Sequence, residues 1–108
     1  MKTIIGCSFI LVLILIAAPV NADDFQDAVD AYKQEDYKTA FEKFKPLAEL
    51  GHADAQYNLG ALYGDGRGVS QDYREAVKWH RLSAAQGHAG AQYNLGVMYD
   101  KGIDLFSK

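Results

Sequence analysis

Apolar residues recur at helical spacing along much of the chain. Ala55, Leu59 and Leu62 lie three or four positions apart, which places them on one face of a helix with 3.6 residues per turn. The same spacing returns between Ala91 and Met98, about 36 residues later. Each stretch therefore predicts an amphipathic helix whose apolar face packs on a neighbouring helix.

A different apolar pattern lies between these two stretches and predicts a helix that ends near Gln86. Asp72 followed by Glu75 has the form of a capping box at the start of this helix. Gly87 stands where a residue with a left-handed backbone would end it. The predicted buried face comprises Tyr73, Ala76, Val77, His80 and Ala84.

The stretches that share the first pattern are copies of one sequence. GHADAQYNLGALY (residues 51–63) and GHAGAQYNLGVMY (residues 87–99) differ at only three positions, which indicates an internal repeat. The glycine-dense segment 64–71 predicts a loop, because an interior glycine costs a helix about 1 kcal/mol. Gly60 and Gly96 fall inside the predicted helices. We interpret them as positions where a missing side chain lets a paired helix approach closely.

Residues 25–33 and 36–50 predict one more helix pair, joined by a tight turn at Gln34 and Glu35. The predicted fold is all-α, a solenoid of antiparallel helix pairs with about five helices. Its units are a helix pair in 23–50, a complete repeat in 51–86 and an incomplete repeat in 87–108. The incomplete repeat holds a single helix over about residues 89–100.

Residues 1–22 predict a cleaved secretory signal peptide. Lys2 precedes an apolar run over residues 9–20, and Ala22 supplies a small residue before the cleavage site. We therefore expect export of residues 23–108 to a Gram-negative periplasm or to the cell exterior, with membrane contact only through the uncleaved signal peptide. The alternative is a retained anchor, although the run is short of the roughly 20 residues of a spanning helix. Cys7 precedes the run, which argues against lipidation.

The charge and the titratable residues argue against several classes of function. The chain has 11 Lys and Arg against 14 Asp and Glu, and this acidic balance argues against nucleic-acid binding. His52 and His88 occupy equivalent places in neighbouring repeats, so they should not converge on one ion, and His80 lies on an apolar face. No serine begins a Ser-x-x-Lys motif. We expect no enzyme activity, no cofactor and no metal site.

The repeated residues resemble the Sel1-like repeat. The similarity covers residues 55–60, 66–69, 72–76 and 84–87, and residues 31–44 resemble the related tetratricopeptide repeat. This resemblance implies a right-handed α-solenoid that binds an as yet unidentified protein or peptide, commonly as an adaptor, without catalysing a reaction.

The resemblance also implies a candidate binding surface. In peptide-binding tetratricopeptide grooves the asparagine that matches Asn58 and Asn94 contacts the ligand backbone, and a side-chain amide can both donate and accept. The alternative is an asparagine bonded to the backbone of its own repeat. The candidate partner-binding residues are Tyr57, Asn58, Ala61, Tyr93, Asn94 and Val97.

An alternative function also follows from the resemblance. Some secreted relatives are linked to peptidoglycan-fragment or β-lactam binding, which here would accompany weak hydrolase activity. Those relatives join each helix pair by a disulfide, whereas residues 23–108 contain no cysteine.

The incomplete repeat leads to an expectation about assembly. The face formed by Ala91, Leu95 and Met98 would pack on a second helix that the sequence after Gly102 is too short to form. The apolar residues among 103–108 could cover only part of it. We therefore expect either marginal stability or a homodimer through the C-terminal half-repeat.

Overall fold

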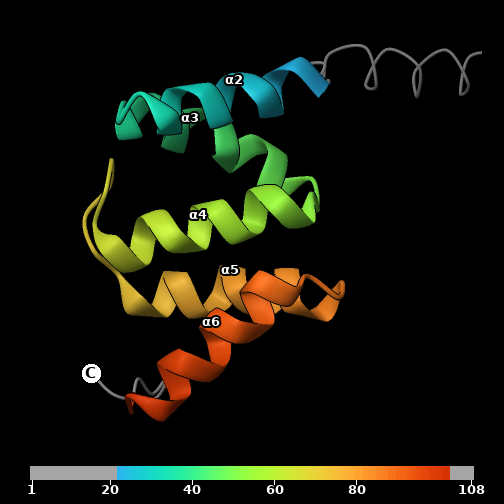
Figure 1. Ribbon diagram of the computed structural model, residues 1–108, viewed down its shortest axis with the longest axis vertical. Helices are drawn as coiled ribbons and strands as arrows, with labels where there is room; N and C mark the ends of the chain where they lie inside the picture. Colours follow the sequence, from blue (N-terminus) through green and yellow to red (C-terminus); the bar gives the residue numbers. More distant parts are fainter. Residues whose placement is uncertain (1–21, 103–108) are drawn as a thin grey trace, which may run out of the picture.

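The computed structural model of the chain describes residues 22–102, in which every regular element is an α-helix. The helices follow one another in chain order down the long axis of the molecule, each packed on the one before it (Figure 1). This is the predicted all-α repeat solenoid. The helices are α2 (Ala22–Lys33), α3 (Tyr37–Glu49), α4 (Ala53–Asp65), α5 (Tyr73–Ala85) and α6 (Ala89–Asp100).

The predicted pairing of helices is confirmed within the described range. α2 with α3 and α4 with α5 form antiparallel pairs, and α6, which packs on α5, is the last helix within residues 22–102 (Figure 1). None of the described helices is long and apolar enough to span a membrane. The predicted signal peptide, apart from Ala22, and the apolar residues of 103–108 lie outside the described residues.

The start of α5 agrees with the cap predicted at Asp72 except in one detail. The Asp72 carboxylate accepts hydrogen bonds from the backbone N–H groups of Arg74 and Glu75, at 3.1 and 3.2 Å. The second half of the expected capping box is absent, because the Glu75 carboxylate instead accepts from the Trp79 indole at 3.2 Å. The Asp72 N–H donates to the Tyr63 carbonyl at 2.9 Å, so this donor is satisfied by α4.

The helix ends repeat with the sequence. Gly51 and Gly87 have φ values of 97° and 91°, as predicted for Gly87. The next residues, His52 and His88, donate their N–H groups back to carbonyls in the last turns of α3 and α5, at 3.1 and 3.3 Å. This is the Schellman arrangement, in which a left-handed glycine stops the helix and satisfies its last carbonyls.

The loop between α4 and α5 is shorter than expected. α4 continues through Gly64 and ends at the left-handed Gly66, with φ of 69°. Gly64 faces α5, and a Cβ built there would be in ordinary contact with Ala76. Gly68 lies against the backbone of Tyr37, and any side chain there would collide with that carbonyl. The glycines of this loop therefore hold it against α3.

The predicted core faces are confirmed for α4 and corrected for α5. Ala55, Leu59 and Leu62 are fully buried. In α5, Tyr73 is 46% exposed, whereas Trp79 is buried although the sequence pattern left it off the apolar face. Trp79 belongs to the core cluster that contains residues of α2, α3 and α4, and its N–H donates to the Glu75 carboxylate.

The expectation for the apolar face of α6 is wrong for Ala91 and Met98, whereas Leu95 is only partly buried. Ala91 is fully buried and Met98 is only 9% exposed, and Met98 forms a core cluster with Ala76 and Val77 of α5. This face packs backwards on the preceding helix, since the equivalent face of α4 packs in the same direction on α2 and α3. Ala91 and Met98 are therefore covered without a further helix.

Candidate binding site

A pocket of about 490 Å³ lies between α4 and α6, with α5 beneath it. Ala61 contributes from α4, and Tyr73 and His80 contribute from α5. From α6, residues three and four positions apart turn toward the pocket because they share a helix face. These α6 residues are Tyr93, Asn94, Val97, Met98 and Lys101.

The structure divides the predicted site residues into two groups. Ala61, Tyr93, Asn94 and Val97 line the pocket. Tyr57 and Asn58 do not. The Tyr57 ring stacks on His88, with centroids 4.5 Å apart, and so joins α4 to the start of α6.

The two predicted asparagines are in different states. Asn58 donates its amide to the Asp54 carbonyl of its own helix at 2.9 Å, which is the local backbone bond considered as the alternative. Asn94 makes no such bond in the described part of the chain, and its amide lines the pocket. Of the two asparagines, only Asn94 therefore lines the pocket with no donor engaged by its own helix, and a side-chain amide can both donate and accept.

Exposed aromatic side chains surround the pocket. Tyr93 is 72% exposed and Tyr73 is 46% exposed. The Tyr73 hydroxyl accepts from the Gln71 amide at 3.0 Å, and the same amide donates to the Gly64 carbonyl at 2.8 Å. Gln71 thus positions the Tyr73 ring, while Tyr93 has little contact with its own protein. Exposed tyrosines of this kind supply contact area at low entropic cost when a partner binds.

His80 forms the floor of the pocket and is only 3% exposed. Burial, with a smaller contribution from His88, lowers the pKa of its imidazole to about 4. The ring is therefore neutral at physiological pH. Its Nδ1 has no hydrogen-bond partner among the described residues. The imidazole lies against Gly60, where an added Cβ would come within 2.8 Å of the ring, which confirms the interpretation of Gly60 as a close-approach position.

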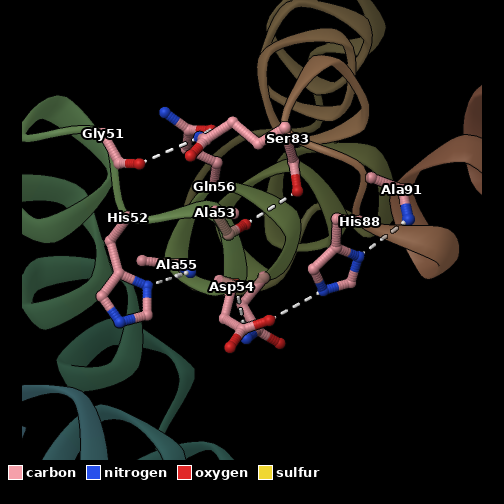
Figure 2. Close-up of polar contacts among 11 residues, drawn as sticks. Gly51, His52, Ala53, Asp54, Ala55, Gln56, Ser83, His88 and Ala91 are labelled. Atoms are coloured by element: carbon pink, nitrogen blue, oxygen red, sulfur yellow. Dashed lines mark hydrogen bonds and ion pairs between the residues drawn. The ribbon is translucent and has the colours of Figure 1, made fainter.

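His52 and His88 cap the starts of α4 and α6. Their Nδ1 atoms accept from the N–H groups of Ala55 and Ala91, each at 3.1 Å (Figure 2). The His88 Nε2 also lies 2.9 Å from an Asp54 carboxylate oxygen. These contacts assign both histidines to helix capping and to the junctions between layers. In residues 22–102 no three His, Cys, Asp or Glu side chains gather as a metal site would require.

Sequence reasoning missed the part of the pocket that comes from α5 and the preceding loop. Gln71, Tyr73 and His80 line it, but the first was read as a loop residue and the others as core. No sequence pattern linked these three residues to a binding site, because only the packing of α4 on α5 brings them to the same surface. Asp65 and Lys101 also line the pocket, and the helical periodicity of the sequence does not predict that these two charged residues share a surface.

Comparison with known proteins agrees with this geometry. The family model for the Sel1 repeat matches residues 53–88 and 89–107. A crystal structure of a Sel1 repeat protein from Oxalobacter formigenes is similar with a TM-score of 0.71 and 35% sequence identity. The similarity covers 82% of this chain and 35% of that one, so the chain spans about a third of the length of that relative. No curated protein matches the chain.

Proposed function

Since this chain belongs to the Sel1 repeat family, whose members generally mediate protein–protein interactions, we propose that it is a non-catalytic module that binds a peptide segment of a partner protein. The pocket between α4 and α6 is the proposed site. The observation that supports this function best is the amide of Asn94, which lines the pocket and is not used by the described residues.

The chemistry of the pocket suits a peptide backbone. The Asn94 amide can donate to a peptide carbonyl and accept from a peptide N–H, which provides affinity with little demand on the ligand sequence. Tyr73 and Tyr93 offer aromatic faces to ligand side chains. The neutral His80 ring beneath them adds no net charge to the floor. Asp65 and Lys101 carry opposite charges, so the lining has no single dominant sign.

We place this activity in the cell envelope or outside the cell, as the predicted signal peptide of residues 1–22 supports. Mass spectrometry of the exported protein should find an N-terminus at Asp23. Recovery of a chain that still carries Met1 would contradict export by cleavage.

Two asparagine variants test the proposed site. A phage-displayed peptide library selected on the purified protein supplies the ligands, and binding of each selected peptide is measured by fluorescence anisotropy. Asn94→Ala should weaken binding about two- to tenfold, because one net hydrogen bond contributes about 0.5 to 1.5 kcal/mol. Asn58→Ala is the matched control and should bind as the original protein does, since its amide is bonded to Asp54.

Two results would contradict this function. Binding by Asn94→Ala as strong as that of the original protein, with unchanged helicity, would place the peptide away from the Asn94 amide. Nitrocefin hydrolysis by the purified protein, or muropeptide binding that Asn94→Ala weakens, would instead support the peptidoglycan-fragment or β-lactam alternative.

A further inference from the structure

The contact between α4 and α5 depends on a small set of groups along one side of α4. The Ser83 hydroxyl donates to the Ala53 carbonyl at 2.8 Å (Figure 2). The Gln86 amide donates to the Gly51 carbonyl and to the Gln56 side-chain oxygen, both at 2.9 Å. Further along α4, the His80 ring fills the space that the absence of a side chain at Gly60 leaves. Three residues of α5, spaced three apart, therefore recognise α4.

The groups on α4 that receive these contacts recur on and just before α6. Gly51, Ala53, Gln56 and Gly60 correspond in the repeat to Gly87, Ala89, Gln92 and Gly96. We call these last four residues the open face of α6.

The open face has the same internal geometry as its counterpart. The Gln92 amide donates to the Ala84 carbonyl at 3.2 Å, as the Gln56 amide donates to the Ala48 carbonyl at 3.1 Å. The side-chain oxygen of Gln92 is thereby left available, as that of Gln56 is for Gln86. The acceptor groups are therefore held in place before any partner binds.

The open face differs from its counterpart in being uncovered by residues 22–102. A Cβ built on Gly96 meets no atom within 4 Å, whereas one built on Gly60 would collide with His80. Gln92 is exposed, whereas Gln56 is only 4% exposed. Within the described range, no serine or glutamine side chain donates to the carbonyls of Gly87 and Ala89. The groups that α5 satisfies on α4 therefore have no equivalent partner on α6.

We propose that the open face of α6 binds an amphipathic helix from another protein that carries the α5 pattern His-x-x-Ser-x-x-Gln. The interface of α4 with α5 is the physical template for this occupant. The partner histidine lies over Gly96, its serine donates to the Ala89 carbonyl, and its glutamine donates to Gly87 and Gln92. A longer side chain opposite Gly96 would fit less well, because the helices would be held apart.

The open face is separate from the peptide-binding pocket. At 100° per residue, Gln92 and Gly96 lie on the side of α6 next to the one that carries Tyr93, Asn94 and Val97, with Gly96 nearest to Tyr93. The pocket lining includes these last three residues but neither Gln92 nor Gly96. The proposed helix site is thus independent of the proposed function, and failure of one leaves the other intact.

A labelled peptide of residues 70–87 provides the first test. Anisotropy with the purified protein should show saturable binding, and Gly96→Leu in the protein should weaken it at least about tenfold by blocking the close approach. A peptide carrying Ser83→Ala and Gln86→Ala should also bind more weakly, because both donors are lost. Binding that is indifferent to Gly96→Leu would overturn the proposal.

Short isolated helices are only marginally stable in water, so a second test joins the same helix covalently to the protein. Gly102 has a φ of 77°, close to the 69° of Gly66, from which the loop to α5 begins. A copy of residues 67–87 appended after Gly102 should therefore reach the open face. It should raise the melting temperature by about 5 °C or more over a scrambled appendage, and Gly96→Leu should cancel the gain.

Two outcomes of the linked experiment would overturn the proposal. An equal melting temperature for the native and scrambled appendages would show that the face does not accept an α5-like helix. Sedimentation of the unmodified protein as a dimer that Gly96→Leu converts to monomer, without peptide binding, would assign the face to a second copy.

Discussion

At the scale of single residues, identical sequence contexts lead to different chemistry. Asn58 and Asn94 lie in the same AQYNLG segment, yet one amide is bonded to its own helix and the other lines a pocket. His80 shows the effect of burial most clearly, because desolvation holds its pKa far below that of an exposed imidazole. Its unpartnered Nδ1 is the one buried polar atom of this kind in the described structure.

The titration of His80 predicts the pH dependence of stability. Its pKa is about 4 in the folded protein and returns to its ordinary value of 6.5 on unfolding. Between these values the unfolded chain binds more protons, so the free energy of unfolding falls as the pH decreases, and the loss is complete below pH 4. From pH 7 to pH 5 the contribution of His80 should fall by at most about 2 kcal/mol.

Urea denaturation at pH 7 and pH 5 measures this contribution. His80→Gln lacks the titrating group and should lose correspondingly less stability over the same interval, whereas the other titrating residues act alike in both proteins. An equal loss in the two proteins would show that the His80 ring is not kept neutral by burial.

At the scale of elements, each helix is specified locally but its partner is not. Asp36 and Asp72 cap α3 and α5, His52 and His88 cap α4 and α6, and the glycines that follow α3 and α5 end those helices. These signals act within a few residues, so they could be recognised before the fold was known. Local sequence does not decide whether a glycine inside a helix, such as Gly60 or Gly96, lies against another helix, because this depends on the tertiary packing.

The pair Gly60 and Gly96 predicts opposite effects of one substitution. Gly96→Ala should stabilise the protein by about 0.5 to 1 kcal/mol, because the position is open and alanine is the better helix former. Gly60→Ala should destabilise it by about 1 kcal/mol, since the new methyl group must displace the buried His80 ring and this overpacking exceeds the helix-propensity gain. Urea denaturation gives both values, and changes of the same sign would contradict this account.

At the scale of the whole molecule, the extensive helix contacts are those between neighbours in a linear stack. α4 packs extensively on both α3 and α5, whereas in the described residues α6 packs extensively only on α5 and touches α4 at fewer points, such as Tyr57. Stability in such an array is roughly a sum of unit and interface contributions. A helix with one interface should therefore open more readily than a helix with two.

Native-state hydrogen exchange tests this gradient. The amides in the middle of α6 should exchange at least about tenfold faster than those in the middle of α4, despite nearly identical sequences. Equal protection of the two helices would indicate that the stack unfolds as one unit or that α6 is covered by a further contact. Saturation with the peptide of residues 70–87 should slow exchange in α6 if that peptide binds its open face.

The sequence by itself determined the helices, the cap at Asp72, the helix end at Gly87 and the repeat, because hydrophobic period, capping side chains and left-handed glycines act over a few residues. It also determined the apolar face of α4. Only the tertiary structure decided that Ala91 and Met98 pack backwards on α5, that Trp79 is buried and that Asn94 lines a pocket. These outcomes depend on which helix lies beside each residue. Two copies of one sequence therefore differ wherever α4 has a neighbour that α6 lacks in the described structure.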